Sequence, residues 1–193
     1  FKKAWTEIYG SMVEYRAQHK AVAGDARSNT VKFEIQDDVK ADVLNVLPQM
    51  RAGALAVQTG LANANARWCH VNFLNFESTA AKDVHVIGDS IQVATGMPKS
   101  GHMANAQAKV TAAAIVAELQ GLEINPQPML TNVCLSYVDQ AQAIHVASVL
   151  EYLHDKKSFF PVAGSGGVSA VRSAQEAKNA EAWAHNIWAD TLK

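Results

Sequence analysis

The sequence predicts an α/β fold, and three stretches carry that prediction. Residues 84–87 form a short, mostly apolar run before Gly88-Asp89, as expected of a strand that gives way to a loop. Residues 104–119 are rich in alanine, and their apolar residues recur at helical spacing. Residues 129–137 and 144–152 have the pattern of two further short strands. Together they predict a chain that mixes helices with a sheet.

Gly88-Asp89 is a candidate ligand-binding position. In open α/β sheets, ligands bind just outside the carboxyl ends of strands, which is where Asp89 falls. The helix that follows would direct its unpaired N–H groups at the same crevice, and these groups favour electron-rich or anionic atoms. An acceptor aimed at a polyol, beside a helix end aimed at a ring carbonyl, suits a flavin. The alternative is an ordinary surface loop after a core strand, and these residues alone leave both interpretations open.

The first fifty residues are predicted to form one helix and three strands. Apolar residues on one face indicate an amphipathic helix, namely Ala4, Trp5, Ile8 and Tyr9. Alternation predicts strands at 12–17, 30–35 and 43–47, and a polar turn at 24–29 precedes the second of them. Pro48 ends the third strand because proline cannot donate to a ladder.

The remaining elements follow in order along the chain. Residues 51–61 are predicted to be a short helix or loop, and 68–72 with 76–79 a short hairpin region. The alanine-rich helix ends near Gly121, before a linker marked by Pro126 and Pro128. After the two strands at 129–137 and 144–152, the glycine-rich segment 164–167 is predicted to be a loop and 170–191 a final helix.

Composition argues against a nucleic-acid-binding surface and against a membrane-spanning segment. The net charge is −1 and charged residues make up 18% of the 193 residues, which does not suit a nucleic-acid surface. Hydrophobic residues reach 49%, but no apolar run approaches the roughly 20 residues that a membrane span requires. Cys69 and Cys134 can pair with each other, remain free or pair elsewhere, and the count does not decide among these.

The chain begins without an initiator methionine and enters its first helix at once. We therefore expect it to begin inside a domain and to be the C-terminal part of a longer protein.

Several blocks of the sequence, in order, resemble one known family. They are spread along most of the chain and are 41–53, Gly60-Leu61, Trp68-Cys69, 76–79, 85–89, 97–101, Ala104-Asn105, 132–136 and 183–187 with Asp190-Thr191. The chain is similar through these blocks to the flavoprotein subunit of flavocytochrome c sulfide dehydrogenase. Its wider relatives are the sulfide:quinone reductases and the pyridine nucleotide-disulfide oxidoreductases of the glutathione reductase fold.

The resemblance implies the C-terminal part of a flavoprotein with two dinucleotide-binding domains, followed by a small α+β C-terminal domain. Residues 1–47 would be the remnant of the second, NADH-like domain, and 48–122 the C-terminal half of the FAD-binding domain. Residues 123–193 would be the family's own C-terminal domain. The half that holds the ADP part of FAD would then lie N-terminal to this chain.

The resemblance also implies FAD as the cofactor and places five residues beside it. Gly88 and Asp89 match the position that hydrogen-bonds the ribityl chain, while Pro98, Lys99 and Ser100 match the segment that lines the isoalloxazine. A lysine and a helix N-terminus at that ring edge would stabilise the reduced flavin. Without the resemblance, Lys99 is equally an ordinary solvated lysine.

Cys134 and Trp183 are the catalytic candidates that the resemblance implies. Cys134 matches one half of a redox-active disulfide whose other cysteine would lie outside this chain. Sulfide would attack that disulfide, and the electrons would pass to flavin and then singly to the haem of a cytochrome c subunit. Trp183 matches a tryptophan close to the flavin. Taken alone, Cys134 is more typical of a small buried hydrophobe, and Trp183 of a packing residue.

Other cysteine chemistry is weaker. Cys69 has no redox role in the resemblance and is interpreted as structural, with a disulfide between Cys69 and Cys134 as the minor alternative. Cys69-His70 has no second pair at ligand spacing, so we predict no metal site. His102-Met103 departs from the family's usual aromatic-serine pair, which bears on substrate preference.

Two alternative functions stay open. One is a sulfide:quinone reductase-like FAD enzyme, although the helix at 170–191 is too polar for the amphipathic membrane helices of that family. The other is a non-catalytic interaction or dimerisation module, which we expect to describe this chain when isolated. The resemblance places the whole protein in the periplasm.

Overall fold

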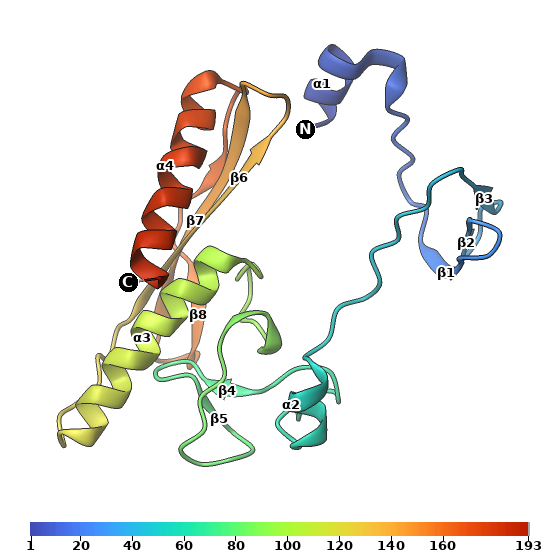
Figure 1. Ribbon diagram of the computed structural model, residues 1–193. Coiled ribbons are helices and arrows are strands. Elements are labelled where there is room, and N and C mark those ends of the chain that lie inside the picture. The colour runs from blue at the N-terminus through green and yellow to red at the C-terminus, as the bar shows by residue number, and fades with distance from the viewer. Residues whose placement is uncertain (193) are drawn as a thin grey trace. The chain divides into compact units, whose positions relative to one another are not determined.

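The computed structural model describes residues 1–192, and the chain divides after Met50 into two units (Figure 1). Each unit has its own hydrogen-bonded sheet, and the two are described separately. The predicted three-part division, at 47 and 122, stays a prediction.

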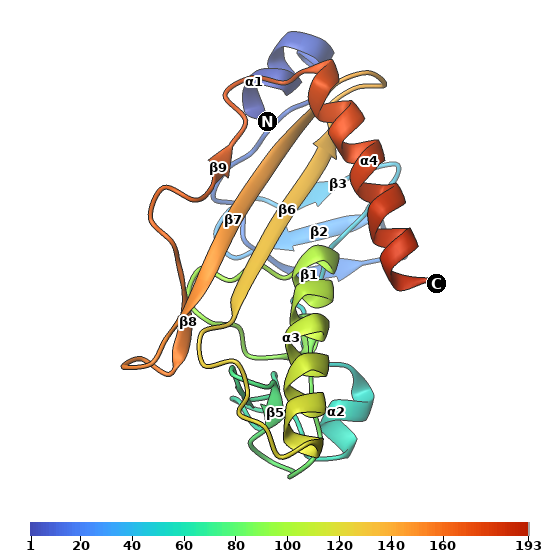
Figure 2. The same cartoon turned by 90° about the vertical axis from the view of Figure 1, so that its left-hand side faces the viewer.

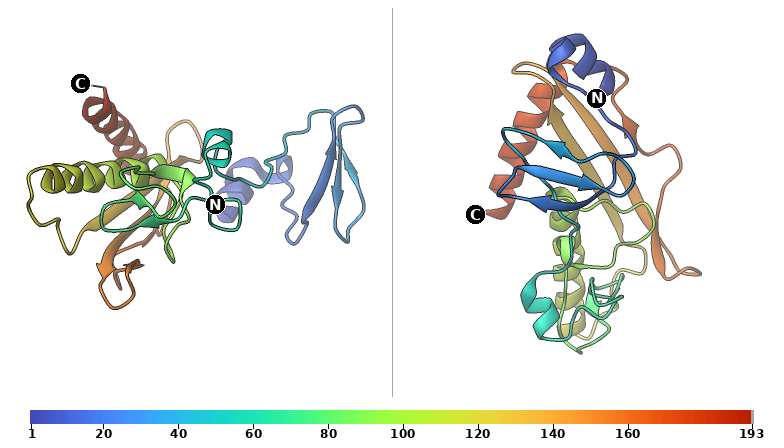
Figure 3. Two further views of the ribbon diagram at one scale, coloured as in Figure 1. Left: turned by 90° about the horizontal axis from the view of Figure 1, so that it is seen from below. Right: turned by 90° about the vertical axis from the view of Figure 1, so that its right-hand side faces the viewer.

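The first unit begins with a helical segment, as predicted. It runs through α1 (Lys2–Ala4), the π-helical turn η1 (Trp5–Tyr9) and the 3-10 turn η2 (Gly10–Met12). A small antiparallel sheet follows in the order β1-β2-β3, formed by β1 (Ala21–Asp25), β2 (Thr30–Phe33) and β3 (Val39–Lys40) (Figure 3). The predicted strand at 30–35 is confirmed by β2.

The predicted strands at 12–17 and 43–47 are wrong. Both stretches alternate, but neither has a neighbouring strand to pair with. In the first, the Tyr15 ring instead lies 5.8 Å from the Trp5 ring and 4.2 Å from the Lys2 ammonium. In the second, Val43 and Leu47 are almost fully exposed. Alternation predicts a strand only where an edge is available to receive it.

The second unit contains the longer elements. They are α2 (Ala54–Gln58), β4 (Val71–Asn72), β5 (Glu77–Ser78), η3 (Gly88–Ser90), α3 (Gly101–Leu119), β6 (Met129–Tyr137), β7 (Ala143–Leu153), β8 (Ser158–Pro161), β9 (Gly167–Val168) and α4 (Ala174–Thr191). β6 and β7 pair over nine residues, and β7 also pairs with β8 and β9 (Figure 2). β4 and β5 form the short hairpin that the sequence predicts.

A buried aromatic and aliphatic cluster holds the second unit together. Its fully buried members come from the loops before α3, from α3 and from three strands, namely Phe76, Ile91, Met103, Leu130, Leu150 and Phe159. The Phe76 and Phe159 rings stack 6.3 Å apart, and Tyr152 meets Phe159 edge to face at 5.7 Å. These contacts fix α3 and its preceding loop against the sheet.

The segment at 84–89 is not the buried strand that the sequence predicts. His85 forms one isolated bridge with Glu77, and Val84 and Ile87 are each more than a third exposed. The chain then turns into η3 at Gly88, where φ is +71°. β5 is only two residues long, so it offers too short an edge to extend this pairing into a strand.

α4 covers one face of the long strand pair. The Tyr137 hydroxyl donates to the Ala177 carbonyl oxygen at 3.0 Å, and His145, opposite Leu135, contacts Glu176. The odd-numbered residues of β6 therefore face α4. Asn132 and Cys134 lie on the other face, where Asn132 meets Ser100 at the start of α3.

The predicted mixture of helix and sheet is confirmed, with every pairing between the named strands antiparallel. Among residues 1–192, no helix has the length and apolar character of a membrane span.

Candidate functional site

The start of α3 is the centre of the candidate site. The Ser100 hydroxyl caps the helix by accepting from the Met103 N–H at 3.0 Å. The N–H groups of Gly101 and His102 donate to no residue among 1–192. Space beside Gly101 is open, because a side chain added there would meet nothing within 4 Å. Two backbone donors therefore stand ready for an acceptor from outside the described chain.

The Gly88 turn packs directly on α3. The Gly88 N–H donates to Oε1 of buried Gln107 at 2.6 Å, and a Cβ on Gly88 would lie 3.5 Å from the Ala104 methyl. That distance is an ordinary van der Waals contact, so the positive φ is the reason for glycine at this position. The neighbouring Asp89 is exposed, and its carboxylate hydrogen-bonds to nothing in residues 1–192.

Lys99 ties the turn at 89–91 to a tryptophan. Its Nζ donates to the carbonyl oxygens of Asp89 at 2.6 Å and Ile91 at 2.8 Å, and lies 3.8 Å from the Trp68 ring centroid. Burial lowers the pKa of Lys99, and the nearby Asp89 charge partly opposes that shift. The side chain is thus half-buried and bonded, unlike a solvated surface lysine, while its role toward a cofactor stays a prediction.

Cys134 is connected to the start of α3 through one buried amide. Nδ2 of Asn132 donates to the Cys134 Sγ at 3.5 Å, and Oδ1 of Asn132 accepts from the Ser100 hydroxyl. Asn132 is only 5% exposed, whereas Cys134 is half-buried. The helix cap and the candidate redox sulfur are therefore linked by consecutive hydrogen bonds.

Trp183 reaches the site from the α4 side of β6. Its indole Nε1–H donates to Nδ1 of His102 at 3.4 Å, and the same nitrogen accepts from the Val133 N–H at 3.0 Å. β6 is an edge strand, so this histidine covers one of its outward backbone donors. With two donors aimed at Nδ1, the ring is assigned as the tautomer that carries its proton on Nε2.

A shallow groove of about 290 Å³ adjoins this contact between α3 and α4. It is lined by His102, Asn105, Lys109, Trp183, Asn186, Ile187 and Asp190. Asp190 accepts from Lys109 at 2.7 Å and from Asn105 at 3.0 Å, and these contacts hold the pKa of its carboxyl below the ordinary value.

The structure gathers the predicted residues around one helix start but does not place them all in contact. Gly88 packs on α3, Ser100 caps it, and Cys134 is joined to that cap through Asn132. Trp183 is separated from Cys134 by the strand and reaches α3 through His102. Pro98 is half-buried just before the cap.

Asn132, His102 and Gln107 also support the site, and the sequence did not predict this role for them. The first lies two residues before Cys134, which is the strand spacing that puts both on one face. That spacing was the one available signal.

The two cysteines are both free thiols, so the alternative disulfide between them is not formed. Cys69 is fully buried, and burial raises the pKa of its thiol. Its N–H donates to the Ser90 carbonyl oxygen and its own carbonyl accepts from the Gln92 N–H, both through the backbone. These contacts support its structural interpretation.

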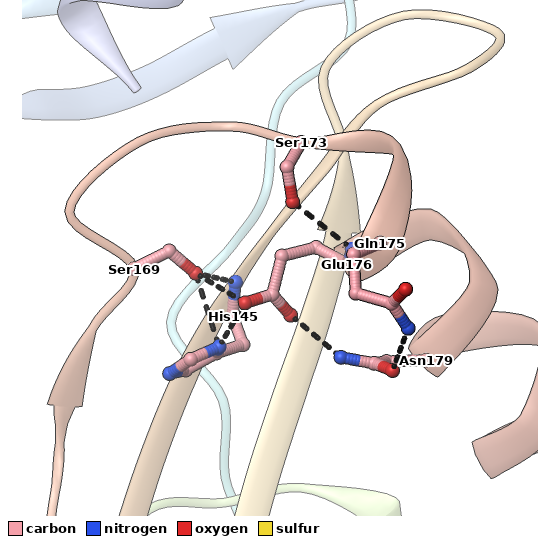
Figure 4. Close-up of polar contacts among 6 residues, drawn as sticks. All are labelled: His145, Ser169, Ser173, Gln175, Glu176 and Asn179. Atoms are coloured by element: carbon pink, nitrogen blue, oxygen red, sulfur yellow. Dashed lines mark hydrogen bonds and ion pairs between the residues drawn. The ribbon is translucent and has the colours of Figure 1, made fainter.

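A serine, a histidine and a glutamate meet where α4 begins, but they do not form a nucleophilic triad (Figure 4). In such a triad the imidazole bridges serine and carboxylate through its two nitrogens. Here Nδ1 of His145 lies both 2.7 Å from Glu176 and 3.0 Å from the Ser169 hydroxyl. The cluster instead fastens α4 to β7, and the His145 hydrogen bond lowers the pKa of Glu176.

Comparison with known families identifies both ends of the chain. Residues 126–192 match the family described as flavocytochrome c sulphide dehydrogenase, flavin-binding. Residues 1–48 match the family described as sulfide dehydrogenase (flavocytochrome c) flavoprotein chain, central. The two matches name the same protein, in the order central then flavin-binding, and together they span more than half of the sequence. The flavin-binding match supports FAD as the cofactor, and the family name implies a cytochrome c partner. The chain therefore belongs to the flavoprotein chains of flavocytochrome c sulfide dehydrogenase, and it carries their central and flavin-binding regions.

Proposed function

We propose that the chain forms part of an FAD-dependent sulfide dehydrogenase of the periplasm, which oxidises sulfide at a cysteine disulfide and delivers electrons to a cytochrome c subunit. The observation that carries this proposal is the hydrogen-bonded chain from the Cys134 sulfur through Asn132 to Ser100. It joins the one thiol that is not fully buried to a helix start with open backbone donors.

The residues at the start of α3 fit a flavin. The unpaired N–H groups of Gly101 and His102 suit an electron-rich ring carbonyl, and the exposed Asp89 carboxylate suits a polyol hydroxyl. Pro98, Lys99 and Ser100 lead into that helix start and would border the ring. When bound, the flavin supplies a two-electron acceptor that can release electrons singly to haem.

The chain's own contribution to sulfide oxidation is a sulfur. In the oxidised protein, Cys134 would be bonded to a cysteine outside this chain. Hydrosulfide attack would break that S–S bond and form a new one, leaving a persulfide on one cysteine and a thiolate on the other. Lys99 and the helix start would favour negative charge at the cofactor edge.

Replacement of Cys134 tests the proposal. In the flavoprotein assembled with its cytochrome c subunit, Cys134→Ser should abolish sulfide-dependent cytochrome c reduction and leave the flavin absorption spectrum in place. Cys69→Ala is the matched control, because that thiol is fully buried and is expected to leave turnover intact. Normal turnover in Cys134→Ser would remove this sulfur from the reaction. In the wild-type protein, sulfide-dependent reduction of an added quinone in place of cytochrome c would instead favour a quinone reductase.

A further inference from the structure

We propose that Asn132 is a positioning residue that stabilises negative charge on the Cys134 sulfur by donating its side-chain N–H to it. The inference deepens the proposed function, since it rests on Cys134 being the reacting sulfur.

The geometry supplies a donor aimed at the sulfur from a buried side chain. Asn132 and Cys134 are two residues apart on β6 and therefore share the face that points away from α4. Nδ2 of Asn132 lies 3.5 Å from Sγ, within the range of an N–H···S hydrogen bond. The amide is almost fully buried, so the donor is shielded from competing water.

The rest of the network fixes which end of the amide faces the sulfur. The Ser100 hydroxyl oxygen accepts from the Met103 N–H, which leaves its proton free to be donated. Oδ1 of Asn132 takes that proton, so Nδ2 must turn toward Cys134. A flipped amide would turn its oxygen toward the sulfur, where it could accept from a thiol but would repel a thiolate. The cap of α3 thus holds the orientation of the donor.

The consequence is a thiolate that is stabilised by the amide N–H and is a weaker nucleophile for that reason. A hydrogen bond to a thiolate favours the charged form, and that gain opposes intrinsic nucleophilicity with a Brønsted coefficient of about 0.4–0.5. Removing the donor should therefore change the rate of thiol–disulfide exchange in opposite directions at neutral and at high pH.

The test is the rate at which the reduced chain reacts with a small aromatic disulfide whose released thiolate is coloured. Cys69 is 0% exposed in the folded chain, so the signal reports Cys134, with Cys134→Ser as the background. In Asn132→Leu, which keeps the size and removes the amide, we expect exchange roughly threefold slower at about pH 7. At about pH 10.5, well above the ordinary thiol pKa of about 8.5, we expect exchange in Asn132→Leu to be roughly threefold faster than in the wild type.

Ser136→Ala is the matched control, because Ser136 lies on the same face of β6, two residues beyond Cys134, with no hydrogen bond to its sulfur. Its rates should equal those of the wild type at both pH values. If Asn132→Leu exchanges faster than the wild type at both pH values, or slower at both, the proposal is overturned. A change in one direction only is what simple loosening of the strand would cause.

Ser100→Ala covers the case in which Asn132→Leu does not fold. It leaves the amide in place but frees its orientation, so the same inversion should appear at smaller size, and Ser100→Thr should restore wild-type rates. No inversion in Ser100→Ala would equally overturn the proposal. Loss of sulfide turnover in Cys134→Ser tests the proposed function separately, because the exchange assay needs neither flavin nor cytochrome.

Discussion

His102 joins two helices and a strand through one ring nitrogen. Its Nδ1 accepts from the Trp183 indole at 3.4 Å and from the Val133 backbone at 3.0 Å. In His102→Phe both donors lose their acceptor, and we expect the free energy of unfolding to fall by about 1–2 kcal/mol. In His102→Asn, the side-chain oxygen takes the place of Nδ1, and most of that loss should be recovered. Urea denaturation of the wild type and the two variants measures these differences. Equal stability of the Phe and Asn variants would show that the acceptor at Nδ1 does not contribute.

At the residue scale, the sequence predicts the reactive side chains better than their supports. Cys134 stands out by its chemical type, and Ser100 lies in one of the blocks that carry the family resemblance. The contacts that hold them are made between distant residues: His102 and Val133 are 31 positions apart in the sequence, and His102 and Trp183 are 81 apart. No local pattern encodes such pairs, because they exist only after the helices have packed on the sheet.

Among the elements, long periodic segments are predictable and short ones are not. α3, β6 and β7 agree with the predicted 104–119, 129–137 and 144–152 to within three residues at each end. The predicted loop at 164–167 is confirmed up to Gly166, but Gly167 already belongs to β9 and pairs with Ala147. A side chain on Gly166 would collide with the Ala147 carbonyl oxygen, so glycine is required for this approach. The prediction for a segment such as 43–47 is wrong because a strand forms only where a partner strand is available, whatever its own alternation.

Helix α4 is fastened at both ends by carboxylates, which makes its attachment sensitive to acid. Glu176 accepts from His145 near its start and Asp190 from Lys109 near its end, and each contact lowers the pKa of the carboxyl. The stability that these groups provide is complete above the ordinary carboxyl pKa of about 4 and is lost as pH falls through the lowered folded value.

Asp190→Asn tests this sign. We expect the variant to unfold at lower urea concentration than the wild type near neutral pH, and the difference between them to shrink steadily below about pH 4. Glu181→Gln is the matched control, since Glu181 is an exposed carboxylate on the same helix with no ion pair among the described residues. A difference for Asp190→Asn that does not depend on pH would show that the lost contact is not electrostatic.

At the scale of the whole molecule, the two units differ in how much apolar surface they bury. The second unit is built on buried aromatic and aliphatic side chains, whereas every residue of β1 in the first unit is exposed. The sequence shows this difference only weakly, because apolar residues such as Ile35 and Val43 occur in the first unit too but remain on its surface. Burial of apolar area is the main source of stability, so the second unit should resist opening more strongly.

Limited proteolysis follows from that difference. Thermolysin cleaves before bulky apolar residues, and the extended segment at 43–50 presents Val43 at 86% exposure and Leu47 at 89%. Leu119 is 83% exposed, but its backbone is hydrogen-bonded within α3 and cannot enter a protease cleft without unfolding. We therefore expect the first cuts between residues 42 and 50, followed by digestion of the first unit, while a product that begins in this segment and ends at the C-terminus persists. Mass spectrometry of a time course identifies each cut. Early cleavage before Leu119 with an intact 43–50 segment would contradict this, because it would place the weakest backbone in α3 rather than at the end of the first unit.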